Sequence, residues 1–299
     1  MDMELIEIEA FVTIASSGTF TAAAERLHVS QPAISRRIDL LEAELGAPLF
    51  ERTRTGVQLT DAGAAFLPFA TRVIADLRDG AAAVREMATG NRGTISLAVV
   101  GTLANTDLLE RIRAFRATHP DVHLQLGTAN SNGVSQLVRS GEAQLGLRYY
   151  PDRSAGLETT HIADETLVLV RARDSRLAPS RVSEPADLGG IPFVCFPVGT
   201  GSSGEPFALE VDRLLGALGL GDAERVVIDS LTAQKRMIEA DFGIGLMLES
   251  AISEELRLGT LEIIEGLDID ARAPIHLVRR RGGYLSAAMK RLIEALTQG

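Results

Sequence analysis

The sequence predicts an α/β protein preceded by a small, all-α N-terminal domain. Three observations support this fold class. Residues 1–60 form short helical patterns, residues 61–90 form one long helical pattern, and residues 93–299 alternate strand-like with helix-like segments. A length of 299 residues fits about two domains, at roughly 100–200 residues each. We therefore predict one domain at 1–60, a linker helix at 61–90 and a second domain at 91–299.

Composition excludes several classes of protein. The chain is 45% hydrophobic with a net charge of −10, so it is globular and cannot bind polyanions by bulk charge. Any nucleic-acid contact must come from a local basic patch. The single cysteine, Cys195, excludes an intrachain disulfide and a four-cysteine zinc site, and the histidines lack metal-ligand spacing. We expect no metal and no cofactor. No signal peptide or membrane span is visible, which predicts a cytoplasmic protein with no membrane partner.

The first 46 residues predict three helices. The first ends at Gly18, the second spans Phe20–Leu27 after a Thr19 cap, and the third follows a Ser30 cap with Pro32 in its first turn. The buried faces follow helical spacing, with Leu5, Ile8, Phe11, Val12 and Ala15 in the first helix and Ile34, Ile38, Leu41 and Leu45 in the third. Two helices joined by about three residues, the second well capped, predict a helix-turn-helix.

The outward face of the third helix is polar and basic near its start. It carries Gln31, Ala33, Ser35, Arg36 and Arg37. Arginine and glutamine at the N-terminal end of a recognition helix can read base edges in the major groove. The alternative is a solvated helix face with ordinary arginines.

Residues 49–60 predict a β-hairpin. Two short strand-like pieces flank a turn that contains Gly56, and Arg52 and Arg54 lie beside it. Such a wing would bring its arginines to phosphate or to the minor groove.

More than forty residues in register resemble the N-terminal signature of LysR-type transcriptional regulators. The matching residues are Phe20-Thr21-Ala22-Ala23-Ala24, Leu27, Ser30-Gln31-Pro32-Ala33-Ile34-Ser35, Ile38, Leu41-Glu42, Leu45-Gly46, Leu49-Phe50, Arg52, Arg54 and Thr60-Asp61-Ala62-Gly63. The resemblance implies a winged helix-turn-helix, a long linker helix for dimerisation, and a C-terminal effector domain resembling type 2 periplasmic binding proteins. It implies that Ser30, Gln31, Pro32, Ala33, Ser35 and Arg36 face the groove and that Arg52 and Arg54 are wing contacts. Arg37, which we include among the DNA contacts, stands where many members have another polar residue.

The linker region, 61–90, carries its own signal for self-association. Apolar or small residues recur at heptad spacing, at Phe66, Ala70, Val73, Leu77, Gly80, Val84 and Met87. This spacing predicts a two-stranded coiled coil, and hence a homodimer or homotetramer. Gly80 leaves a gap in the seam and Pro68 removes a backbone hydrogen bond. The alternative is packing against the chain's own effector domain.

The C-terminal half predicts a parallel sheet. Strand-like segments at 95–100, 122–126 and 145–147 alternate with helices, and a similar set recurs at 193–248 before the strand 275–279 and the helix 286–296. The family resemblance implies two subdomains crossed twice. We place the crossings near 163–165 and 266–268, so that subdomain I is 93–164 with 267–299 and subdomain II is 165–266.

Ligands of open α/β sheets bind beyond the carboxyl ends of strands. The polar residues there are Thr102, Asn105, Asn130, Ser131, Arg148, Thr200, Gly201, Ser202, Ser203 and Ser230. The Gly/Ser loop could offer N–H groups to an anion and Arg148 could pair with a carboxylate, which predicts an anionic small-molecule effector. The alternative is helix capping, for which small polar residues serve equally well.

No signature of an enzyme is present. The C-terminal half has no Gly-x-Ser-x-Gly turn and no glycine-rich fingerprint after its first strand. Cys195, within the apolar run 191–197, predicts a buried structural thiol without a basic neighbour. We therefore predict a transcription regulator, not an enzyme, with promoter DNA, a small-molecule effector, further copies of itself and RNA polymerase as partners. The alternative is a solute-binding or enzyme-like α/β protein fused to a helical domain.

Overall fold

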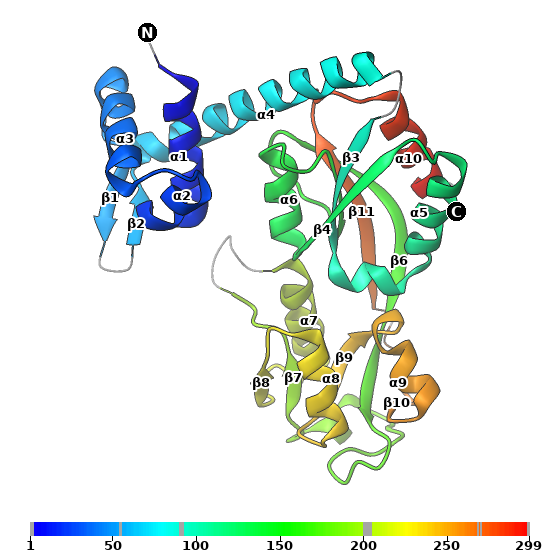
Figure 1. The fold of residues 1–299 in the computed structure, drawn as a ribbon. Helices are drawn as coiled ribbons and strands as arrows, with labels where there is room; N and C mark the ends of the chain where they lie inside the picture. Colours follow the sequence, from blue (N-terminus) through cyan, green and yellow to red (C-terminus); the bar gives the residue numbers. More distant parts are fainter. Residues whose placement is uncertain are drawn as a thin grey trace. The chain divides into compact units, whose positions relative to one another are not determined.

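The computed structural model describes residues 3–53, 56–89, 93–199, 205–267, 269 and 271–297; the side chains of residues 52, 53, 86–89 and 105 lie outside this description. The chain divides into two compact units, one built on the first 90 residues and the other on most of the remainder. Figure 1 shows the helices and strands of both units. In the part of the chain that the structure describes, no helix combines the length and apolar character needed to cross a bilayer.

The N-terminal unit is a three-helix bundle with a hairpin. Its elements are α1 (Leu5–Ser17), α2 (Phe20–Arg26), α3 (Gln31–Leu45), β1 (Phe50–Thr53), β2 (Gly56–Leu59) and the long helix α4 (Asp61–Thr89). β1 and β2 pair antiparallel. Phe11 is fully buried at the centre, with its ring 5.2 Å from Phe50 and 5.3 Å from Phe66. The apolar faces expected from the sequence form this core, apart from Leu5, which is exposed, and Ala15, which is half-buried outside it.

The predicted caps define the helix boundaries. The hydroxyl of Thr19 accepts the N–H of Ala22 at 3.1 Å, and that of Ser30 accepts the N–H of Ala33 at 3.4 Å. Gly18 and Gly46 end α1 and α3 in the left-handed conformation, with φ of 72° and 70°. Glycine adopts this conformation at no steric cost, so both helices end where the sequence predicts.

The start of α4 is tied to the wing. The hydroxyl of Thr60 accepts the N–H of Gly63 at 3.0 Å and donates to the carbonyl of Pro48 at 2.7 Å. A Cβ on residue 63 would lie 2.1 Å from the carbonyl oxygen of Leu49, so only glycine fits there. The Thr60–Gly63 motif is therefore a packing requirement at the junction of wing and helix.

The C-terminal unit begins with the predicted parallel strands. They are β3 (Thr94–Val100), β4 (His123–Ala129) and β5 (Leu145–Tyr149), in the order β4-β3-β5. The connections are η1 (Gly101–Asn105) with α5 (Asp107–Thr118), and α6 (Ser131–Arg139). β11 (Arg272–Arg280) pairs antiparallel with β5, and the final helix is α10 (Ala287–Thr297). α5 and α10 cover one face of this sheet and α6 covers the other.

A long strand that the sequence does not predict joins the two subdomains. β6 (Leu157–Ala172) pairs with β11 up to Thr166, and from Leu167 it pairs with β9 (Gly245–Leu248) and β10 (Leu261–Ile263). The chain therefore crosses between subdomains inside a continuous strand, about two residues after the predicted crossing. The return lies between β10 and β11, where residues 268 and 270 are outside the described part.

Subdomain II repeats the alternation on a smaller scale. Its further elements are η2 (Pro185–Leu188), β7 (Phe193–Cys195), α7 (Pro206–Ala217), β8 (Arg225–Val227), α8 (Leu231–Glu239), η4 (Ser250–Ile252) and α9 (Ser253–Leu258). β7 and β8 pair in parallel, and a bridge between Phe193 and Ile244 brings β7 beside the strand β9. The carboxyl ends of β7 and β8 are therefore held close to β9.

Candidate functional site

The first turn of α3 presents a polar and basic surface. Ser30, Gln31, Pro32 and Arg36 are exposed, and Ala33, Ser35 and Arg37 are half-buried. The opposite face of the helix, with Ile34, Ile38 and Leu41, is buried in the core. Neither Arg36 nor Arg37 forms an ion pair within the described residues, so both guanidinium groups are available to a polyanion.

The wing is fixed to the helices by hydrogen bonds from its backbone N–H groups. Glu42, on α3, accepts the N–H groups of Leu49 at 2.6 Å and Phe50 at 3.2 Å. The N–H of Val57 donates to the carbonyl of Gly18 at 3.1 Å. These bonds fix the hairpin relative to α1 and α3. Arg54 and the side chain of Arg52, the predicted wing contacts, lie outside the described part of the chain.

A cavity of about 550 Å³ lies within the C-terminal unit. Subdomain I contributes residues at or just beyond the carboxyl ends of β3, β4 and β5, and subdomain II contributes residues around β7, β8 and β9. The described lining residues are Val100, Gly101, Thr102, Ala129, Asn130, Tyr149, Phe196, Pro197, Gly199, Glu205, Phe207, Asp229, Leu231, Gln234, Leu246, Met247, Leu248 and Ala251. This volume is within the range of small-molecule sites, and the position follows the rule for open α/β sheets.

A chain of hydroxyl groups connects the cavity to the crossing strand. The hydroxyl of Thr102 donates to that of Tyr149 at 3.1 Å, and Tyr149 donates to the carboxylate of Glu165 at 2.5 Å. Ser250, from subdomain II, donates to the other oxygen of Glu165. Burial raises the pKa of Tyr149 above its usual range, and the nearby Glu165 adds to the effect. Burial also raises the pKa of Glu165, although hydrogen bonds from Ser250 and Tyr149 oppose the change.

Each half of the chain matches the model of a known protein family. Residues 5–64 match the model for bacterial regulatory helix-turn-helix proteins of the lysR family, and residues 88–299 match the model for the LysR substrate binding domain. This chain belongs to the LysR family. The alternative of a solute-binding or enzyme-like protein is therefore excluded, because members of this family are transcriptional regulators with a DNA-binding and an effector-binding domain.

Full-length relatives cover nearly the whole chain. This chain is 32% identical to the HTH-type transcriptional regulator TfdS of Cupriavidus pinatubonensis over 279 residues. The matched region covers 92% of each protein. The crystal structure of CbnR, a LysR family transcriptional regulator, is 28% identical with a TM-score of 0.63 and covers 98% of both chains. Full-length CbnR in complex with its target DNA is 29% identical with a TM-score of 0.61, covering 98% of this chain and 99% of that one.

Two residues predicted for the effector site line the cavity of this LysR-family chain. Thr102 lies at the end of β3 and Asn130 at the end of β4. Ser131 is fully buried beside Asn130, at the start of α6. Ser230 caps α8 through the N–H of Ala233 and is not among the lining residues. Thr200, Gly201, Ser202 and Ser203, and the side chain of Asn105, lie outside the described part.

Arg148 differs from its predicted role as an effector contact. Its side chain is 2% exposed and does not line the cavity; its guanidinium donates to Ser135 and, at 2.8 Å, to Asp152. Successive side chains of a strand point to opposite faces, and the neighbour Tyr149 faces the cavity instead. β5 is buried on both faces, so its sequence carries no alternation that could have shown which face Arg148 takes.

The apolar lining residues were not predicted, because only polar residues beyond the strands carry a sequence signal for a ligand site. Phe196, Phe207 and Leu246 are apolar walls, and apolar residues dominate ligand pockets. Glu205 and Asp229 precede α7 and α8, where acidic residues are common as helix starts. Their approach to one cavity depends on the tertiary structure.

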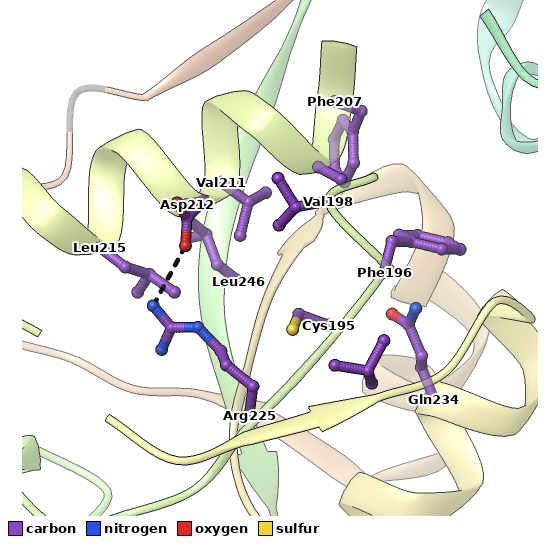
Figure 2. A pocket seen from close by; sticks show the side chains of 12 residues that line it. Cys195, Phe196, Val198, Phe207, Val211, Asp212, Leu215, Arg225, Gln234 and Leu246 are labelled. Carbon is purple, nitrogen blue, oxygen red and sulfur yellow. Dashed lines mark hydrogen bonds and ion pairs between the residues drawn. The ribbon is translucent and has the colours of Figure 1, made fainter. Parts of the chain in front are cut away.

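The smaller cavity in Figure 2, of about 80 Å³, contains Cys195. Cys195 is half-buried, and Arg225, paired with Asp212 at 3.4 Å, lines the same cavity. The prediction of a buried thiol without a basic neighbour was therefore wrong in both respects. Burial nevertheless raises the pKa of Cys195, because it outweighs the positive charge of Arg225. The thiol is protonated and weakly nucleophilic at neutral pH.

Proposed function

We propose that a small molecule in the cavity of about 550 Å³ changes how this regulator binds promoter DNA through paired winged helices. The observation that carries the proposal is the position of that cavity. Its walls come from both subdomains, so a ligand inside it contacts both at once. A ligand that binds one arrangement of the subdomains more tightly shifts the protein toward that arrangement.

The face of α3 is proposed as the base-reading surface. It is exposed, its helix N-terminus is capped by Ser30, and Arg36 and Gln31 can hydrogen-bond base edges. A gel shift with the DNA upstream of the chain's own gene tests this proposal. Retardation that survives excess non-specific competitor is expected. Equal loss of the complex with specific and non-specific competitor would contradict sequence-specific binding.

We also propose that α4 pairs with α4 of a second copy, since one helix-turn-helix contacts only half of a two-fold site. Val73, Leu77 and Val84 are exposed at the predicted spacing, with exposed fractions of 42%, 51% and 67%. Phe66 and Ala70 pack into the core of their own domain, so the proposed seam begins at Val73; the side chain of Met87 lies outside the described part.

Leu77→Lys tests this seam, with Leu258→Lys as the matched control. Both leucines are exposed in the single chain, and Leu258 lies on α9. A lysine at 77 would place an unpaired ammonium in the helix pair, which is costly. We expect Leu77→Lys to lower the sedimentation coefficient and operator affinity, and Leu258→Lys to change neither. Unchanged assembly and affinity in Leu77→Lys would move the dimer contact away from α4.

The remaining partners follow from the role at a promoter. A promoter-bound regulator meets RNA polymerase, and we propose that this protein contacts it in the cytoplasm, where bacterial promoter DNA lies. Co-sedimentation of the regulator, its operator and RNA polymerase tests the contact. Sedimentation of the regulator alone distinguishes a homodimer from a homotetramer.

A further inference from the structure

The chain's own Glu205 occupies the N-terminus of α6. Its carboxylate accepts the N–H of Ser131 at 3.1 Å and the N–H of Asn132 at 3.4 Å. α6 belongs to subdomain I, whereas Glu205 immediately precedes α7 of subdomain II, so the contact bridges the cavity. The N-terminus of a helix attracts anions through its free N–H groups and its dipole. Glu205 therefore fills the place at which a ligand carboxylate would bind.

A second feature of the same helix end also indicates an anion subsite. Ser131 is fully buried, and its hydroxyl oxygen has no hydrogen-bond partner in the described part of the chain. Buried hydroxyl groups normally have partners, because an unpaired one costs free energy. This hydroxyl remains available to an anion that replaces Glu205.

The charged residues of the described lining are acidic, and Asn130 adds an amide nitrogen, because its oxygen already accepts the N–H of Gly133 at 2.8 Å. Asp229 lines the cavity beside the start of α8, and Gln234 is buried with its amide nitrogen donated to the carbonyl of Ile228 at 2.6 Å. The amide oxygen and the second amide N–H of Gln234 are therefore left for a ligand. No lysine, arginine or histidine is among the described lining residues.

Cations near the cavity are paired with carboxylates of the chain itself. Arg148 pairs with Asp152 at 2.8 Å, Arg225 with Asp212 at 3.4 Å, and Lys235 with Glu255 at 2.7 Å. Each guanidinium or ammonium group thus has its own counter-charge. A carboxylate ligand would meet two acidic side chains without a free cation to balance them.

We propose that Glu205 determines specificity and that the effector is an apolar molecule carrying a cationic amine. This inference rests on the proposed effector function of the cavity. The apolar walls, among them Phe196, Phe207 and Leu248, would hold the body of the ligand, and Asp229 with the Gln234 oxygen would accept hydrogen bonds from its ammonium. The ammonium would be attracted by the carboxylate of Asp229, which is exposed, and by that of Glu205, which is half-buried. The proposal differs from the anionic effector expected from the Gly/Ser loop, most of which lies outside the described residues.

Three probes with the same phenylpropyl body test the ligand class. They are 3-phenylpropylamine, 3-phenylpropanol and 3-phenylpropanoate, each titrated into the full-length protein by calorimetry. We expect the amine to bind at least tenfold more tightly than the carboxylate, with the alcohol between them. Equal or tighter binding of the carboxylate overturns the proposal, and so does the absence of amine binding at millimolar concentration.

Variants of Glu205 test the specificity residue. Glu205→Ala frees the N–H groups of α6, so we expect the carboxylate probe to gain at least tenfold in affinity; Glu205→Gln, which removes the charge alone, should gain less. Glu210→Ala is the matched control, because Glu210 lies on α7, pairs with Arg213 and does not line the cavity. An unchanged carboxylate affinity in both Glu205 variants overturns the role of Glu205.

The amine itself is tested through Asp229→Asn. We expect this variant to bind the amine at least tenfold more weakly and the alcohol unchanged, and equal loss of both would overturn the ammonium contact. Gel shifts of the wild-type protein and of Glu210→Ala, without probe, are run beside the titrations. Failure of both proteins to bind DNA would contradict the proposed function, whereas intact DNA binding with a reversed order of probe affinities would contradict the ligand class alone.

Discussion

The ion pair between Arg148 and Asp152 predicts a large effect of a small substitution, Asp152→Asn. The guanidinium is 2% exposed and lies 2.8 Å from the Asp152 carboxylate, whose side chain is 13% exposed. Asparagine has nearly the same shape as aspartate but carries no charge. The substitution therefore leaves a buried cation without the carboxylate that balances it.

Removal of one partner from a buried ion pair costs about 3–5 kcal/mol. The lower end applies here, because the guanidinium keeps its hydrogen bonds to Ser135 and to the carbonyl of Tyr149. For a unit of about 200 residues, a loss of about 3 kcal/mol lowers the melting temperature by about 6–12 °C.

The effect has a defined pH dependence. Burial raises the pKa of Asp152, but hydrogen bonds from Ser154 and Ser135 and the charge of Arg148 outweigh it, and the pKa falls to about 2. A lowered carboxyl pKa contributes stability above the unfolded value of 3.8, and that contribution is lost as the pH falls toward 2. The difference between wild type and Asp152→Asn should therefore be full at pH 7 and shrink below pH 4.

Calorimetric melting of the full-length protein measures this difference. Glu110→Gln is the control, because Glu110 and Arg113 form an exposed pair at 3.3 Å, and such pairs contribute about 0–1 kcal/mol. A melting temperature of Asp152→Asn within about 2 °C of the control would refute the reasoning, because it would mean that Asp152 does not balance Arg148. Arg148 would then return as a candidate ligand contact.

Three further substitutions test the other elements. Arg36→Ala should weaken binding to the specific operator by about 1–3 kcal/mol and relax one base position, whereas unchanged specific affinity in a gel shift would move the reading face elsewhere. Thr102→Phe fills part of the cavity and should abolish the effector response of a promoter fusion. Thr94→Phe, at an exposed position at the other end of β3, should retain both the response and DNA binding. A normal response in Thr102→Phe would mean that the effector binds elsewhere. Because the pKa of Glu165 is raised in the folded protein, ionisation of this carboxyl costs stability as the pH rises above 4.5. The melting temperature of Glu165→Gln should therefore rise relative to that of wild type between pH 5 and pH 8. A difference that stays constant over this range would contradict the raised pKa.

Local sequence determined most of the N-terminal unit. The caps at Thr19 and Ser30 and the stops at Gly18 and Gly46 act through neighbouring backbone groups, so they can be identified without knowing the fold. The apolar spacing of α3 likewise identified its buried face, and therefore its exposed face. The same kind of signal predicted the parallel strands β3, β4 and β5.

Sequence patterns are less informative where one segment has two environments. β6 is a single strand that pairs with one sheet up to Thr166 and with another from Leu167, and its residues carry no signal of that exchange. The heptad pattern of α4 was also ambiguous, because Phe66 and Ala70 have the same spacing as Val73 and Leu77 but belong to the core of their own domain.

The cavity was decided by the tertiary structure alone. Thr102 and Asn130 could be predicted because a ligand site lies where parallel strands end, and the sequence locates those ends. The choice of Tyr149 over Arg148 depends on which face of a doubly buried strand each side chain takes, and Glu205 reaches Ser131 across 74 positions of sequence. Local propensity and periodicity depend on near neighbours along the chain, whereas the contacts between these residues arise only when distant segments pack against each other.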